Sequence, residues 1–185
     1  MALRSTIHKA VLSIADIDRG YYGDHELTLA LHPSETEERM MVRLLAFALH
    51  AGDGLAFGRG LSTDDEPDLW RRDPTGLVEH WIDVGWPDER RVRRACGRAA
   101  RVSVLSYGGR RADVWWTQNA AAMARNAGLD VAAVPPQATA GLSGLARRAM
   151  RLSVNVQDGH IWVGDDSGDG VGFELDVLHE ARRRA

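Results

Sequence analysis

The 185-residue sequence contains one cysteine and one lysine. The single cysteine, Cys96, excludes an internal disulfide, and it falls on the apolar face of a predicted helix, where a packed thiol is expected. Lys9 is the only lysine, so every other positive side chain is an arginine, which stays protonated and does not transfer protons. Any lysine-type acid or base is therefore restricted to one position.

Long apolar runs are absent too, because no stretch approaches the roughly 18 residues that a membrane span requires. The N-terminal residues predict a strand and not a signal peptide. The sequence lacks a CxxC pair, histidines spaced four apart, and the P-loop and serine-hydrolase motifs. We therefore expect a cytoplasmic protein with no zinc site and no membrane partner.

The bulk composition is that of an ordinary globular domain, with 44% hydrophobic and 26% charged residues. A chain of this length buries a substantial core. The net charge of −3 argues against indiscriminate coating of nucleic acid, which needs many basic contacts, but it permits a local basic face. The sequence does not specify an oligomeric state.

Hydrophobic periodicity predicts an α/β chain. The first helix is expected after Ser34 as N-cap, with Glu37 as its capping-box partner. A second helix begins with Pro87 in its first turn, and Asp158-Gly159 predicts a hairpin. Further helices are expected at 112–127 and 141–150, and strands at 5–16, 26–31, 55–61, 68–72, 78–84, 102–107, 129–134, 152–156, 161–163 and 171–178.

The middle of the chain thus runs helix, three strands, helix, strand, while both ends are antiparallel β. One arrangement that satisfies this order is a single domain over residues 1–185. Its α/β core covers about 33–134, and a β extension is built from about 1–32 and 150–180.

Two carboxylates stand at predicted strand ends. Asp68 follows Pro67, and fifteen residues later Asp83 ends a hydrophobic strand, at the edge where ligands lie in open α/β sheets. If the strands are neighbours, both side chains can hold Mg²⁺, with Mn²⁺ as a surrogate, because a hard cation prefers oxygen. Otherwise Asp68 is a turn residue and Asp83 merely ends its strand.

Other polar residues are candidates for the same site. Asp65 and Glu66 are either solvent-facing or supply a further carboxylate. Glu38 shares a helix face with Met41 and Leu45, where an acid needs a partner. Gln118 follows two tryptophans and is either a donor to a phosphate or base, or a surface amide.

The helix after Asp83 is rich in arginine. Most of these side chains fit a solvated face paired with nearby acids. Arg90 and Arg91 lie nearest Asp83, and their forked guanidinium groups suit a phosphate. If the site is catalytic, Arg91 is the first choice and Arg90 the second for a cation close to Asp83.

The Pro67-Asp68 and Asp83 spacing is similar to that of the PD-(D/E)xK nuclease core, whose strand motif ends acid, any residue, lysine. Here Gly85 stands where that motif has lysine. Several segments together resemble the YaeQ family of bacterial proteins, and they are H-P-S-E-T-E-E-R-M-M-V-R-L-L-A, D-D-E-P-D-L-W, W-I-D-V-G-W-P-D-E-R-R, W-W-T-Q-N and Q-D-G-H-I-W-V.

The YaeQ resemblance covers nearly the whole chain. It implies a variant of the PD-(D/E)xK fold and a polar pocket, onto which the following residues are carried: Ser34, Glu38, Asp65, Asp68, Asp83 and Gln118. It also implies a loose link to bacterial transcription.

Two functions follow as expectations. The first is Mg²⁺-dependent phosphodiester hydrolysis with an altered site, in which a metal-bound hydroxide attacks without a lysine. The second is a non-catalytic module that binds nucleic acid or a transcription-related protein through a degenerate polar pocket.

Overall fold

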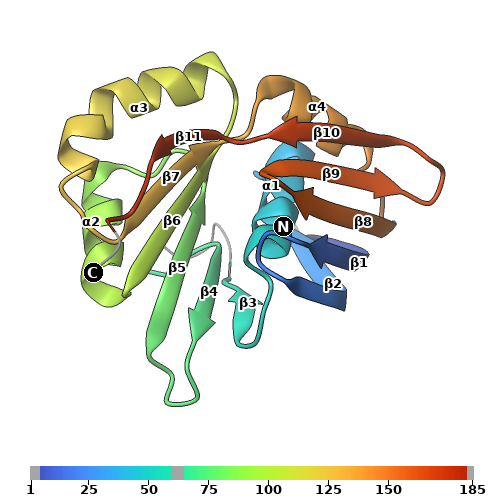
Figure 1. Cartoon of the computed structure of the whole chain (residues 1–185), viewed down its shortest axis with the longest axis horizontal. Helices are drawn as coiled ribbons and strands as arrows, with labels where there is room; N and C mark the ends of the chain where they lie inside the picture. The colour runs from blue at the N-terminus through green and yellow to red at the C-terminus, as the bar shows by residue number, and fades with distance from the viewer. Residues whose placement is uncertain (1–4, 60–64, 183–185) are drawn as a thin grey trace. The chain divides into compact units, whose positions relative to one another are not determined.

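The computed structural model describes residues 5–59 and 65–182. These residues form two mixed sheets and four helices (Figure 1). Contacts divide the chain into two compact units. The first unit comprises 1–51 and 136–175, and the second unit comprises 52–135 and 176–185.

The first unit is built on a five-stranded sheet in the order β10-β9-β8-β1-β2. Its strands are β1 (Thr6–Asp16), β2 (Tyr21–Leu31), β8 (Ala149–Gln157), β9 (His160–Asp165) and β10 (Gly170–Glu174). The β1–β8 pair is parallel, and the other pairs are antiparallel. Helices α1 (Glu37–His50) and α4 (Pro136–Gly144) pack on one face, where Leu12, Leu45, Leu142 and Val163 meet.

The second unit contains a six-stranded sheet in the order β11-β7-β6-β5-β4-β3. Its strands are β3 (Leu55–Phe57), β4 (Leu69–Arg72), β5 (Val78–Val84), β6 (Arg101–Ser106), β7 (Leu129–Ala133) and β11 (Asp176–His179). Strands β5, β6 and β7 are parallel. Helices α2 (Glu89–Arg98) and α3 (Arg110–Met123) cover a core that includes Trp81, Val92, Val104, Trp115 and Met123.

The predicted α/β class and central element order are confirmed, since α1, β3, β4, β5, α2 and β6 follow one another along the chain. Strand β5 has the predicted bounds. The Asp158-Gly159 hairpin is confirmed as well, with both residues at positive φ. None of the helices among residues 5–59 and 65–182 is long and apolar enough to cross a membrane. The single-domain assignment stays a prediction.

The predicted start of the first helix is wrong by two residues. Thr36 is the N-cap, and its Oγ1 accepts a hydrogen bond from the Arg39 amide at 3.1 Å. The Ser34 hydroxyl instead lies 2.6 Å from Nδ1 of His32, and Glu37 is the first helical residue. Similarly, α2 begins two residues later than Pro87 suggested, at Glu89, because Asp88 caps it.

Two predictions near the C-terminus are also wrong. The helix expected at 141–150 lies at Pro136–Gly144, because Pro136 is the first residue of the helix. Residues 149–157 then alternate between buried and exposed as strand β8. The strand expected at 171–178 is split, because β10 pairs with β9 whereas β11 pairs with β7.

Candidate functional site

Asp83 and Arg91 form a two-point ion pair in the second unit. Arg91 Nε lies 2.8 Å from Oδ2 of Asp83, and Nη2 lies 2.8 Å from Oδ1. Asp83 ends a buried strand, and the Asp88 cap starts α2 so that its first turn reaches back. Burial raises the pKa of Asp83, the Arg91 guanidinium opposes that rise, and the nearby Asp68 carboxylate adds to it.

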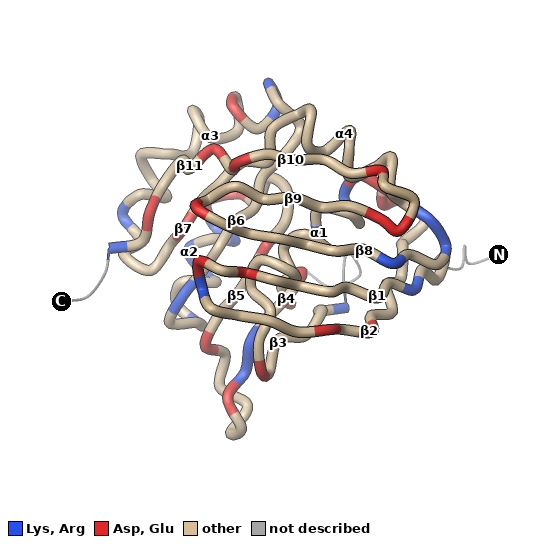
Figure 2. Tube along the Cα trace, turned by 45° about the vertical axis from the view of Figure 1, so that its right-hand side comes forward, with Lys and Arg blue, Asp and Glu red and all other residues tan. Residues whose placement is uncertain are grey.

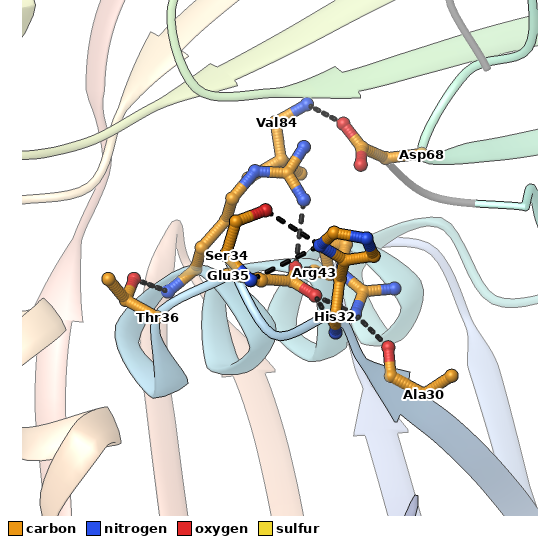
Figure 3. A network of polar contacts seen from close by, with 9 residues as sticks. Ala30, His32, Ser34, Glu35, Thr36, Arg43, Asp68 and Val84 are labelled. Atoms are coloured by element: carbon orange, nitrogen blue, oxygen red, sulfur yellow. Dashed lines mark hydrogen bonds and ion pairs between the residues drawn. The ribbon is translucent and has the colours of Figure 1, made fainter. Parts of the chain in front are cut away.

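Asp68 lies one residue beyond the Leu69–Ile82 pair of β4 and β5, so it faces the end of β5 near Asp83. Its side chain is buried, and Oδ2 accepts a hydrogen bond from the Val84 amide at 2.7 Å (Figure 3). The structure therefore brings Asp68, Asp83 and Arg91 together, as predicted for neighbouring strands.

The arginine face of α2 holds the acidic loop before β4. Arg91 Nη2 donates to the Glu66 carbonyl at 2.8 Å, and Arg94 Nη1 to Asp65 Oδ1 at 3.1 Å. Arg98 Nη1 donates to the Asp65 carbonyl at 3.3 Å. Much of the face expected to be solvated is thus engaged by residues about thirty positions earlier in the chain, although Arg93 pairs with Glu89 as expected.

Backbone geometry explains the glycine at position 85. Gly85 has φ +110° and donates its amide to the Leu105 carbonyl at 3.0 Å. This left-handed region is unfavourable for a side chain with Cβ. A lysine at position 85 would therefore be strained where Gly85 is not.

The residues do not fit a Mg²⁺ ion as they are arranged. Both oxygens of Asp83 are engaged by Arg91, and Asp68 uses one oxygen on the backbone. Asp65 is 77% exposed and pairs with Arg94. Mg²⁺ requires six oxygen ligands in octahedral geometry. No group of three or more His, Cys, Asp or Glu among the described residues is placed to hold a metal.

The other predicted site residues are not part of the contacts around Asp83. Arg90 is exposed in the first turn of α2, and Gln118 is exposed on α3. Ser34 and Glu38 belong to the first unit, where Ser34 is exposed and Glu38 is half-buried. The convergence of Glu38 with the aspartates stays a prediction.

The acid of this region that is buried and paired is Glu35, which the sequence did not single out. Its Oε1 lies 2.7 Å from Arg43 Nε and 2.8 Å from Arg39 Nη1, and its Oε2 lies 2.9 Å from Arg43 Nη2. Arg43 also donates to the Ala30 carbonyl at 3.1 Å (Figure 3). The signal was present, because positions 35, 39 and 43 repeat at helical spacing.

A second buried polar pair lies on neighbouring strands of the six-stranded sheet. Nε2 of His80 on β5 is 2.8 Å from Oγ of Ser103 on β6, and both residues are buried. Burial, together with the positive charges of Arg101 and Arg71, lowers the pKa of His80 to about 3. His80 is therefore a neutral, structural histidine at neutral pH.

Asp68→Ala is expected to lower the free energy of unfolding by about 1–3 kcal/mol, because it leaves the buried Val84 amide without its acceptor. Asp68→Asn, which keeps an acceptor oxygen, is expected to lose less. Urea unfolding followed by circular dichroism measures the difference. Asp65→Ala is the matched control, since an exposed ion pair contributes little. Equal losses at positions 65 and 68 would contradict the structural role of Asp68.

Comparison with known proteins assigns the family. The profile described as YaeQ protein matches residues 1–171. The chain is 46% identical to "Uncharacterized protein YaeQ" of Escherichia coli (strain K12) over 169 residues, which are 91% of this chain and 93% of that protein. The Salmonella typhi protein of the same name is 47% identical over 165 residues, which cover 89% and 91% of the two chains.

Solved structures agree with this result. The crystal structure of the YaeQ protein from Xanthomonas axonopodis pv. citri matches with a TM-score of 0.91 and 53% identity, covering 95% of this chain and 98% of that one. That from Pseudomonas syringae matches with a TM-score of 0.90 and 41% identity, covering 97% and 98%. The chain therefore belongs to the YaeQ family.

Proposed function

We propose that this protein is a non-catalytic, nucleic-acid-binding relative of the PD-(D/E)xK nucleases, in which Arg91 takes the place of the metal ion. The observation that carries the proposal is the two-point pair between Arg91 and Asp83, with both N–O distances at 2.8 Å. A guanidinium group neutralises the carboxylate that a metal would otherwise bind, and it does so without generating a hydroxide.

The element order supports the nuclease-like core. A helix precedes three strands, of which β4 and β5 are antiparallel, and α2 then leads to β6, which is parallel to β5. Asp68 and Asp83 stand at the neighbouring ends of β4 and β5. These are the positions expected for the two acids of the motif, while Gly85 replaces its lysine.

Exposed arginines support phosphate binding at the same edge of the sheet. Arg90 lies in the first turn of α2, whereas Arg110 and Arg111 lie in the first turn of α3. The Arg111 guanidinium stacks 3.7 Å from the ring centroid of Trp86, which precedes α2. Ligands of α/β sheets lie beyond the carboxyl ends of parallel strands, and arginine binds phosphate oxygens in pairs.

Arg91→Ala is expected to create a metal response that the unchanged protein lacks. Removing the guanidinium takes away the counter-charge of Asp83 beside the second carboxylate of Asp68. A divalent cation that binds there stabilises the native state. We expect Mn²⁺ to raise the melting temperature of Arg91→Ala by a few degrees and to leave that of the unchanged protein where it is. Arg93→Ala, on the solvent side of the same helix, is the matched control.

Binding and cleavage assays test the rest of the proposal. Labelled DNA and RNA are titrated by fluorescence anisotropy at several salt concentrations and incubated with Mg²⁺ or Mn²⁺. We expect binding without cleavage, and a salt slope reduced by about one for each phosphate-contacting arginine removed at positions 90 and 110. Arg125→Ala, just beyond the far end of α3, is the control. Metal-dependent cleavage abolished by Asp83→Ala would overturn the proposal, as would binding to protein partners alone.

A further inference from the structure

Trp162 lies flat on the outer face of the five-stranded sheet, the face opposite α1 and α4. A Cβ added at Gly164, Gly170 or Gly172 would come within 2.9, 2.5 and 3.2 Å of its indole ring, respectively. None of these three glycines has a positive φ, so backbone conformation does not require them. A side chain at any of them would meet the indole together with atoms of Asp169, Val163 or His160, and Trp162 is 42% exposed.

A second exposed aromatic residue shares the same row of the sheet. Strand pairing places Trp162 beside Asn155, Asn155 beside Ala15, and Ala15 beside Tyr22, which is 65% exposed. Three strand spacings separate the two aromatic positions, or about 14 Å. Ala15 and Asn155 lie between them in this row, and a hollow of about 420 Å³ is lined by Ser13, Tyr22, Asp24, Ser153 and Asn155.

Basic residues lie farther along the same face. Arg151 is exposed beside Val11, and Lys9 is exposed two residues before Val11 on β1. Figure 2 shows basic residues at this end of β8 and acidic residues at the same end of β9. Both cations line a second hollow of about 600 Å³. Neither has an ion pair with any residue of the ranges 5–59 and 65–182.

We propose that this outer face binds single-stranded nucleic acid, with bases stacked on Trp162 and Tyr22 and phosphates near Lys9 and Arg151. The occupant must offer flat rings, hydrogen-bonding groups and negative charge along one flexible chain, and nucleotides combine all three. Sheet faces with exposed aromatic side chains bind single strands in this way, because every base has a stacking surface. A duplex hides its bases and cannot stack on Trp162.

The acidic residues of this face reduce the contribution of phosphate contacts to the proposed binding. Glu26, Asp165 and Asp166 line the same hollow as Lys9, Arg147 and Arg151, and Asp24 lines the other hollow, so the local charges nearly balance. Stacking must then contribute more than phosphate contacts. We expect a shallow salt dependence, with a slope of about −1 to −2, because each phosphate contact on a single strand adds about −0.7.

The test is a titration of the full chain with labelled short oligothymidine and oligouridine, with a duplex and a neutral oligosaccharide as comparison ligands. We expect Trp162→Ala to weaken single-strand binding about tenfold or more, and Tyr22→Ala to weaken it less. Trp162→Tyr restores stacking and is expected to recover most of the affinity. Val177→Ala, which removes an exposed apolar side chain of the second unit, should have no effect.

Circular dichroism of each variant shows that it is folded. Unchanged affinity in folded Trp162→Ala, preference for the duplex or the oligosaccharide, or a steep salt slope would overturn the inference. So would sedimentation showing a dimer that Trp162→Ala dissociates, since the face would then bind a second copy. The arginine variants at positions 90 and 110 test the proposed site at the edge of the six-stranded sheet. The Trp162 and Tyr22 variants test the outer face of the five-stranded sheet, so each proposal can be refuted without the other.

Discussion

Glu35→Ala is expected to lower the free energy of unfolding by about 3–5 kcal/mol, the usual cost of breaking a buried ion pair from one side. The Glu35 side chain is 2% exposed and that of Arg43 is 4% exposed. Removal of the carboxylate leaves the buried guanidinium of Arg43 without its counter-charge (Figure 3). Since domains are stable by only about 5–15 kcal/mol, a large fraction of the first unit's stability depends on this contact.

Urea unfolding provides the measurement, and Glu37→Ala is its control, because Glu37 is exposed two residues away at the start of the same helix. The double variant Glu35→Leu, Arg43→Leu is expected to regain most of the loss, since it no longer buries the charge of Arg43. A double variant as unstable as Glu35→Ala would contradict the explanation that the loss comes from the buried charge of Arg43.

Acid is expected to destabilise the protein through His80. The pKa of His80 is about 3 in the folded chain and about 6.5 when unfolded, so the folded state binds fewer protons between these values. Its contribution is therefore complete above about pH 6.5 and is lost as the pH falls toward 3. By linkage, we expect a loss of about 2–3 kcal/mol between about pH 7 and pH 4.5.

His80→Gln should flatten this part of the pH profile, because glutamine does not titrate and can still bond to Ser103. The measurement is the difference in unfolding free energy between the unchanged protein and the variant at each pH. His160→Gln, at an exposed position of β9, should leave the profile as it was. Parallel profiles for the unchanged protein and His80→Gln would refute the assignment.

Local patterns predicted those parts of the fold that local forces determine. The bounds of β5 follow from its β-branched and aromatic residues, and the Asp158-Gly159 turn follows from backbone preferences. The start of α1 could not be predicted in this way, because Ser34 and Thr36 are both good caps. With Thr36 as the N-cap, Glu35 makes buried contacts with Arg39 and Arg43. A short window of sequence does not show which acid becomes buried.

The candidate site also contains contacts that the sequence predicts and contacts that it does not predict. Arg91 could be placed near Asp83 from sequence, because only a turn and one helical turn separate them. The roles of Arg94 and Arg98 could not, since Asp65 lies about thirty residues earlier and is brought to α2 by β4 and β5. Periodicity indicates which face of a helix is polar, but it does not say whether water or another segment meets that face.

The parallel pairing of β1 with β8 also governs when the first unit can fold during synthesis. Strand β1 pairs with β2 on one edge, but Lys9 pairs with Ala149, so its partner on the other edge, β8, is translated only after all of residues 52–135. At about 5–20 residues per second, the nascent chain carries an unpaired edge of β1 for about ten seconds or more. Such distant pairing slows folding and exposes apolar strand surface. The ribosome-bound chain therefore passes through a prolonged stage in which Leu12 and Ile14 lack the cover of β8.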